Sequence, residues 1–228
     1  MQQDGHDNAS NRAYHDLRQA IVRGELPTDR KVTEAGLSER LGISRTPIRE
    51  AIKRLLLEGL LERRRGQGLW CPVPQADEIR EIFDLRVRLE SYAARSAAKH
   101  ATAEQIDMLS ASAARMSELV EADPMTVEVI EQIDIENSHF HAMIIDAAHS
   151  QRLKHLVKST VDISLVSRTF RRFTPEQRVR SAYHHREIAA SIAARSPAWA
   201  EKMMEIHILS AADIFQTSDS SDIGASIK

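Results

Sequence analysis

Apolar and polar positions alternate with a period of three to four over the first sixty or so residues, a pattern that predicts amphipathic helices. Three stretches carry it, and a glycine follows each one. The first helix is expected over 9–23, the second after the N-cap Thr33 and the third after the N-cap Ser44. The glycines that end them are Gly24, Gly42 and Gly59.

The segment after the third helix changes from helical spacing to a hairpin pattern. In "LLERRRGQGLWCPVP", two short apolar runs flank the glycine-containing turn from Arg65 to Gly68. Three helices followed by a two-stranded ribbon is the element order of a winged helix-turn-helix. Pro72 and Pro74 then form a stiff junction, which is the expected domain boundary.

Beyond this junction the pattern is helical, and strand signals are absent. Thr102 is a predicted N-cap, and Asp123-Pro124 ends the helix that follows it. The expected fold is therefore mainly α, with a winged helix-turn-helix before an all-helical bundle of about six helices. The later helices are expected at roughly 126–149, 151–172, 175–195 and 197–216. The expected domains are a disordered tail at 1–8, a winged helix-turn-helix domain at 9–74, a helical domain at 75–218 and a tail at 219–228.

Charge is distributed unevenly between the two parts. Residues 1–74 hold 13 Lys and Arg and 10 Asp and Glu, a net of +3, while the remainder holds 31 − 13 = 18 and 33 − 10 = 23, a net of −5. This asymmetry indicates a basic module joined to an acidic one. No apolar run approaches the roughly 20 residues of a membrane-spanning helix. The single cysteine, Cys71, favours a cytoplasmic location.

The start of the third helix carries the candidate chemistry of the basic module. On a helical wheel Arg45, Arg49 and Lys53 form a cationic edge beside the apolar stripe, and Ser44 and Thr46 lie at the same end. Such a helix can bury one side and place its first turns in a major groove, where arginine forks match guanine acceptors. The simpler alternative is a solvated surface helix, but the preceding helix-turn and the basic turn favour DNA.

These residues carry a family resemblance. The stretch "LRQAIVRGELPTDRKVTEAGLSERLGISRTPIREAIKRLLLEGLLERRRGQGLW" resembles the DNA-binding domain of GntR-type bacterial transcription regulators, most specifically in "LGISRTPIREAIKRL". The resemblance implies that Arg45, Thr46 and Arg49 read the operator and that Ser44 and Gly66 contact the backbone or lie in the wing. The turn containing Arg65 and Gly66 is suited to the DNA backbone or an adjacent minor groove.

Seven of the ten histidines lie between residues 139 and 207 of the helical part. Helical wheels place Asn137 and His141 on one apolar face, His185 on a second and His207 on a third. Buried imidazoles need polar partners. A shared metal would satisfy them, and zinc and nickel suit imidazole. Separate core histidines bonded to backbone carbonyls are the alternative.

The helical part also resembles a known domain, the FCD effector domain of FadR-like GntR regulators. The matching segments are "FDLRVRLESYAARSAAKHA", "IENSHFHAMIIDAAHSQRL" and "HHREIAASIAARSPAWAEKMMEIHI". The resemblance implies that Asn137, His141, His185 and His207 hold a divalent metal, zinc or nickel, with Asn137 in place of the usual Asp lowering the affinity. It also implies a small organic acid beside the metal, with Arg86 as its carboxylate partner. An i,i+4 ion pair with Glu90 is the alternative role for Arg86.

The leading interpretation is a ligand-responsive transcription regulator, not an enzyme, that binds a palindromic operator as a homodimer. Repression is its expected mode. Two copies of one short recognition helix explain useful specificity. A metal-dependent hydrolase with a nucleic-acid-binding appendage is the alternative. Against it, the sequence has no helical His-Glu-x-x-His pair and no evident general base beside the histidines.

Overall fold

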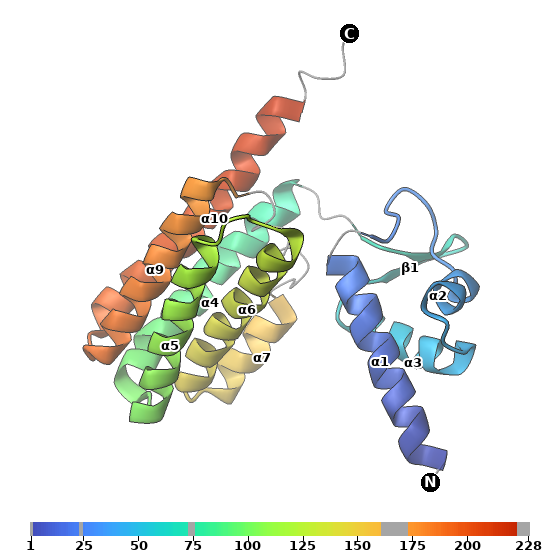
Figure 1. Cartoon of the computed structure of the whole chain (residues 1–228), viewed down its shortest axis with the longest axis horizontal. Helices are drawn as coiled ribbons and strands as arrows, with labels where there is room; N and C mark the ends of the chain where they lie inside the picture. Colours follow the sequence, from blue (N-terminus) through green and yellow to red (C-terminus); the bar gives the residue numbers. More distant parts are fainter. Residues whose placement is uncertain (1, 23–24, 73–75, 161–172, 223–228) are drawn as a thin grey trace. The chain divides into compact units, whose positions relative to one another are not determined.

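The computed structural model describes residues 2–22, 25–72, 76–160 and 173–222, which fall into two compact units. The first unit ends in the described chain after β2, and the second begins with α4 (Figure 1). The boundary expected at residue 74 lies outside the described residues. Both units follow the expected class: the first holds three helices and a two-stranded sheet, and the described part of the second is helical.

The first unit is a winged helix-turn-helix. Its elements are α1 (Gln2–Val22), α2 (Glu34–Leu41), α3 (Arg45–Leu57), β1 (Glu62–Arg64) and β2 (Gly68–Trp70). The start of α1 corrects the expected tail at 1–8, because the helix begins at Gln2. Residues 2–8 contain no apolar side chain, so no periodic pattern marks them. These residues are nevertheless helical, because backbone hydrogen bonding propagates to them from the apolar turns that follow.

The core of this unit lies between α1, α2 and α3. Leu17 of α1 and Ile48 and Leu55 of α3 are fully buried. The two strands are antiparallel, and Val32 extends their sheet by a bridge to Leu69. The hairpin of β1 and β2, called the wing, is thus joined to the segment that leads into α2. This bridge fixes the wing relative to α3, the expected recognition helix.

The second unit is built from helices, and short turns join those that follow one another within residues 76–160 and within residues 173–222. Its described helices are α4 (Ala76–His100), α5 (Ala103–Val120), α6 (Val127–Ala147), α7 (Gln151–Thr160), α9 (Pro175–Ala193) and α10 (Pro197–Asp222). The part of the helix expected at 161–172 lies outside the described residues, as do residues 223–228. Helix α10 extends beyond its expected end at 216.

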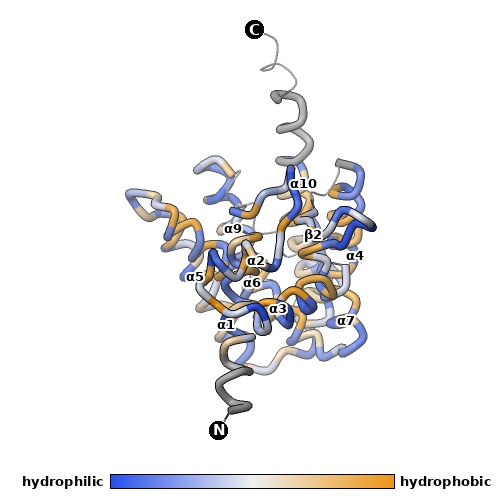
Figure 2. The backbone as a smooth tube through the Cα atoms, turned by 90° about the vertical axis from the view of Figure 1, so that its right-hand side faces the viewer, coloured by the Kyte–Doolittle hydropathy of each residue, from blue (hydrophilic) through white to orange (hydrophobic). Residues whose placement is uncertain are grey.

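The helices of the second unit enclose one interior. Helix α4 packs along α10, and α5 packs against both α6 and α9. Phe140 and Ile144 of α6 and Ile188 and Ile192 of α9 are fully buried. Figure 2 shows hydrophobic and hydrophilic residues mixed within the helices, as in amphipathic helices that each bury one face. Among the described helices, none has the length and hydrophobicity to cross a bilayer.

Candidate metal centre and nucleic-acid interface

The first turns of α3 present the predicted DNA-contacting side chains to solvent. Ser44, Arg45, Thr46 and Arg49 are all exposed. Ser44 occupies the N-cap position, but its side chain makes no capping hydrogen bond. The threonine N-caps of α2, α5, α6 and α9, by contrast, each accept one from the helix backbone. The first amides of α3 are therefore not capped by the Ser44 side chain, and no acidic residue stands in the first turn. This end of the helix suits an anion such as a phosphate.

Arg49 is held by an ion pair with the preceding helix. Its Nε lies 2.7 Å from Oε2 of Glu34, the first residue of α2. The hydrogen bond to Glu34 and the negative charge of that residue raise the pKa of Arg49. The pair uses one edge of the guanidinium and restrains the side chain, while the terminal nitrogens keep donors for a ligand.

The wing places its two adjacent arginines in different environments. The guanidinium of Arg64 lies 4.4 Å from the centroid of the Trp70 ring and forms an ion pair of 2.6 Å with Glu62. Arg65 and Gly66 are exposed in the turn, where Gly66 has a φ of 74°. That left-handed conformation favours glycine. Arg64 is thus part of the packing of the hairpin, whereas Arg65 projects from its tip.

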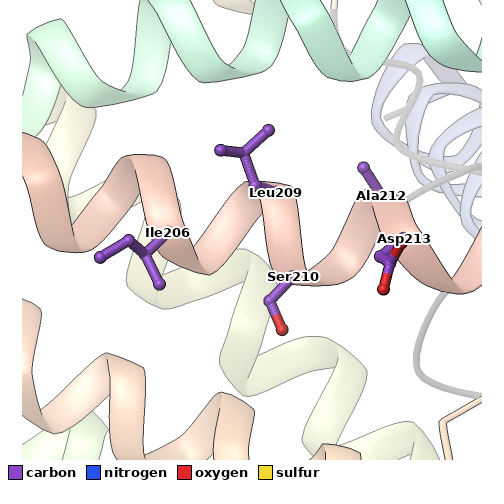
Figure 3. Close-up of a pocket in the computed structure, with 5 residues that line it drawn as sticks. All are labelled: Ile206, Leu209, Ser210, Ala212 and Asp213. Atoms are coloured by element: carbon purple, nitrogen blue, oxygen red, sulfur yellow. The ribbon is translucent and has the colours of Figure 1, made fainter.

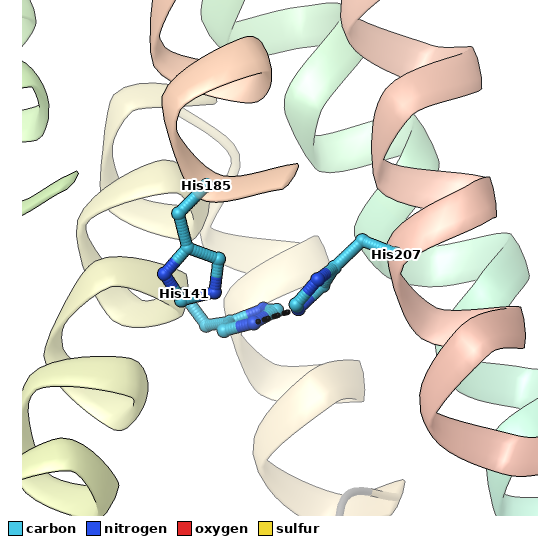
Figure 4. Close-up of side chains that lie close together, drawn as sticks. All are labelled: His141, His185 and His207. Carbon is cyan, nitrogen blue, oxygen red and sulfur yellow. Dashed lines mark hydrogen bonds between the residues drawn. The ribbon is translucent and has the colours of Figure 1, made fainter. Parts of the chain in front are cut away.

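Three buried histidines from three helices meet inside the second unit. His141 of α6, His185 of α9 and His207 of α10 each offer a ring nitrogen, and these atoms lie within 4.8 Å of one another (Figure 4). The Nε2 atoms of His141 and His207 are 3.1 Å apart. Two imidazole nitrogens on a tetrahedral zinc ion, each about 2.0–2.1 Å from the metal, are about 3.3 Å apart. The spacing therefore suits two ligands of one ion.

The hydrogen-bonding state of these rings also fits a metal. Within the described parts of the chain, both ring nitrogens of His185 and Nδ1 of His207 are buried without a hydrogen-bond partner. Burial lowers the pKa of His185 well below 6.5, with further lowering by His141 and His184, and burial likewise lowers the pKa of His207. Neutral imidazoles with free lone pairs are what a divalent ion requires. The residues present fit such an ion better than they fit separate core histidines.

Asn137, the fourth predicted ligand, lies one turn before His141 on α6. Its side chain is buried, and its Oδ1 has no hydrogen-bond partner among the residues that the structure describes. An amide oxygen is a neutral and weaker ligand than a carboxylate oxygen. The structure therefore places Asn137 on the same helix face as His141, with its oxygen available to a ligand.

Glu90 is a residue of the site that the sequence analysis did not select. Its carboxylate contacts Nδ1 of His141 and also accepts a hydrogen bond of 2.7 Å from Nε of Arg86. Burial raises its pKa, but the charges of Arg86 and His141 outweigh that effect and lower the pKa to about 2. A carboxylate behind a histidine fixes the ring and leaves Nε2 for a metal. The only signal in the sequence that could have identified Glu90 was its i,i+4 spacing from Arg86.

Arg86 is buried beside this carboxylate. The expected alternative, an ion pair with Glu90, is present in the structure. The positive charge of Arg86 also contributes to the lowered pKa of His207, so the guanidinium is within electrostatic reach of that ring. The ion pair and a role in binding an acid are compatible, because Glu90 engages only the Nε of Arg86 in the described contacts.

A separate hollow lies on the surface of α10. Its volume is about 510 Å³, and the described lining residues are Ile206, Leu209, Ser210, Ala212 and Asp213 (Figure 3). Ile206 and Leu209 are half exposed there. None of these lining residues belongs to the histidine cluster, so the hollow is not the candidate metal centre.

A winged helix-turn-helix and a helical bundle in one chain define a transcription regulator of the helix-turn-helix class. The family comparisons give the same result: the model for gntR-family bacterial regulatory proteins matches residues 9–70, and the FCD domain model matches residues 81–210. The chain belongs to the GntR family of regulators, in the group that carries an FCD domain. Members of this family are transcription regulators and not enzymes.

Known relatives and structures agree with this assignment. The chain is 26% identical over 208 residues to the HTH-type transcriptional repressor GlaR of Escherichia coli, covering 89% of this chain and 94% of GlaR. It is 27% identical over 150 residues to the uncharacterized regulator YdhC of Bacillus subtilis, but the match spans 66% of this chain and 65% of YdhC. The solved structure of E. coli McbR/YncC matches 92% of this chain and 98% of its own, with a TM-score of 0.75 at 19% identity, and so supports the fold.

Proposed function

We propose that this regulator is a cytoplasmic repressor that binds a palindromic operator as a homodimer and responds to a small carboxylate. Residues 9–74 would form the DNA-binding domain, and residues 75–218 the effector-binding and dimerisation domain. The observation that carries the sensing role is the meeting of three buried imidazoles beside the Arg86–Glu90 pair.

The proposed metal site consists of His141, His185 and His207, with Asn137 as the fourth ligand. Zinc or nickel suits this donor set. When bound, the ion would supply a Lewis-acidic position for an oxygen of the effector. The protein's own residues would fix the geometry: Glu90 orients His141, and Arg86 places a positive charge near the rings.

The proposed DNA contact uses two parts of the first unit, the start of α3 and the turn of the hairpin. Arg45, Thr46 and Arg49 would reach base edges from α3, while Ser44 and the open amides of the helix would meet a phosphate. Arg65 and Gly66 would lie against the backbone or the minor groove. Effector binding would then shift a population between two dimer geometries with different operator affinities.

The rival function, a metal-dependent hydrolase, has weaker support. The carboxylate that contacts the histidine cluster is Glu90, which is bonded to both Arg86 and His141. Those partners lower its pKa to about 2. Such a group is a poor general base at neutral pH, because efficient proton transfer needs a pKa near the operating pH.

Replacing Arg49 by Ala tests the DNA-binding role. We expect a loss of discrimination between cognate and scrambled DNA of about 1–3 kcal/mol for each bidentate base contact removed. Cognate sites can be selected from a random-sequence library, and affinities measured by fluorescence anisotropy. Arg152→Ala, an exposed arginine of α7, is the charge-matched control and should bind as the wild type does. Equal weakening on both DNAs would mean that Arg49 contacts only phosphate.

A further inference from the structure

The cationic edge of α3 has carboxylates beside two of its cations. Arg45, Arg49 and Lys53 are all exposed on this edge. Lys53 pairs within α3, where its Nζ lies 2.8 Å from Oε1 of Glu50. Arg49 pairs with a different helix, because its partner Glu34 is the first residue of α2. The acidic partner of Arg49 is thus placed by the fold of the unit and not by sequence spacing on one helix.

The turn between α2 and α3 holds the two partners of this ion pair in place. The amide of Ile43 donates a hydrogen bond of 3.2 Å to the carbonyl of Ser38, and the Ser38 hydroxyl donates one of 2.5 Å to the carbonyl of Ile43. Leu37 of α2 and Ile48 of α3 are buried in the same core. The turn and the core therefore fix the start of α2 relative to the start of α3.

The ion pair leaves one end of the Arg49 guanidinium for DNA. Five N–H groups are present on a guanidinium, and Nε of Arg49 donates its single one to Oε2 of Glu34 at 2.7 Å. The two terminal nitrogens can still form two parallel hydrogen bonds to O6 and N7 of guanine. Guanine is neutral, whereas a phosphate on the same nitrogens would stand close to the carboxylate of Glu34 and be repelled by it.

We propose that Glu34 is a specificity-determining residue, which holds Arg49 for a guanine and opposes its contact with phosphates. This inference rests on the proposed function, in which Arg49 reads base edges. On DNA without the operator sequence, an unrestrained arginine gains affinity from the nearest phosphate whatever the sequence. The charge of Glu34 reduces that gain and leaves the guanine contact in place. Specificity increases when a repulsive element acts against the wrong ligand.

Glu34→Gln in the full-length protein tests this role, because it keeps the length of the side chain and removes the charge. Affinities for the selected cognate DNA and for scrambled DNA are measured by fluorescence anisotropy at several salt concentrations. We expect scrambled DNA to bind about two- to fivefold more tightly and cognate DNA to bind as before. The slope of log affinity against log salt on scrambled DNA should steepen by about 0.9 for each protomer, the value for one added phosphate contact.

Glu50→Gln is the matched control for the removal of an acidic charge. It frees Lys53 on the same edge of α3 without altering the partner of Arg49. It should strengthen binding to both DNAs by the same factor and leave the discrimination between them unchanged. Glu34→Asp is the second variant, since it keeps the charge on a shorter side chain and should keep the weak binding to scrambled DNA.

A double-variant cycle shows whether the effect of Glu34 acts through Arg49. In an Arg49→Ala protein, Glu34→Gln should leave the discrimination unchanged, because no guanidinium remains to be released. Circular dichroism melts establish that each variant is folded.

Three outcomes would overturn the inference while leaving base reading by Arg49 intact. They are wild-type discrimination and salt slope in a folded Glu34→Gln protein, the same loss of discrimination with and without Arg49, and tightened binding of Glu34→Asp to scrambled DNA. If Arg49→Ala itself leaves discrimination unchanged, the proposed base contact fails and the inference fails with it.

Discussion

At the scale of single residues, Glu90 links Arg86 to the histidine cluster of the helical domain. It is buried, it accepts a hydrogen bond from Arg86, and it contacts Nδ1 of His141. The negative charge compensates Arg86 and at the same time selects the ring orientation that leaves Nε2 of His141 toward His207. The carboxylate of Glu90 thus compensates the charge of Arg86 and also orients His141, a proposed metal ligand. Experiments can measure these two roles separately.

Glu90→Gln should weaken zinc binding by about 10–100-fold, because the amide keeps the size of the side chain but orients His141 less strongly. A competition titration with a chromophoric chelator measures this affinity. Glu78→Gln, an exposed glutamate on the same helix, should have no effect. Unfolding monitored by circular dichroism shows whether the uncompensated Arg86 also destabilises the domain. Unchanged zinc affinity in a folded Glu90→Gln protein would remove Glu90 from the site.

At the scale of elements, the wing separates an arginine that packs in the hairpin, Arg64, from one that we propose to contact DNA, Arg65. Arg64 stacks on Trp70 of the opposing strand and pairs with Glu62 of its own strand. Arg65 stands in the turn with its side chain exposed. Substitutions of these neighbours should therefore have different consequences, although the sequence "RRR" gives no reason to distinguish them.

Arg65→Ala should reduce the slope of log affinity against log salt concentration by about 0.9, the value for one phosphate contact. The thermal stability of the variant should be unchanged. Arg64→Ala serves as the comparison: it should lower stability by about 0.5–1 kcal/mol through loss of the stacked pair. Anisotropy titrations at several salt concentrations and thermal melts measure both quantities. An unchanged slope for Arg65→Ala would place the wing tip away from DNA.

The sequence predicted the elements better than the buried polar groups between them. Apolar spacing and capping residues are local signals, and the predicted helices that lie in the described chain, the hairpin and the histidine cluster are present in the structure. Glu90 was missed because a charged residue on a helix is normally solvated. Whether it is buried depends on which helices pack against it. That arrangement is a property of the whole bundle, which local periodicity does not encode.

At the scale of the whole molecule, the proposed regulation requires that a ligand in one unit alters DNA binding by the other. Such coupling is reciprocal, so operator DNA must change effector affinity by the same factor. The protonation state of the histidines sets the pH range in which this can work. The pKa values of His185 and His207 lie well below 6.5 in the folded protein, so the unfolded chain binds more protons between those values and 6.5. Stability of the metal-free domain should fall as the pH drops through that window.

The zinc content of the purified full-length chain tests the central claim most directly. After equilibration with zinc at pH 7 and removal of excess metal, mass spectrometry should find one ion per chain. The content should persist at pH 6.5 and decline on further acidification, because the lowered pKa values of His185 and His207 keep these ligands neutral until then.

The zinc content of two double variants, measured in the same way, decides which residues hold the ion. His185→Ala combined with His207→Ala should carry almost no zinc while the first unit keeps its fold and its affinity for DNA. His149→Ala combined with His155→Ala removes two exposed histidines of the same domain and should retain one ion per chain. A wild-type chain without zinc, or a His185→Ala, His207→Ala variant that still holds one ion, would contradict the account and return these histidines to the status of core residues.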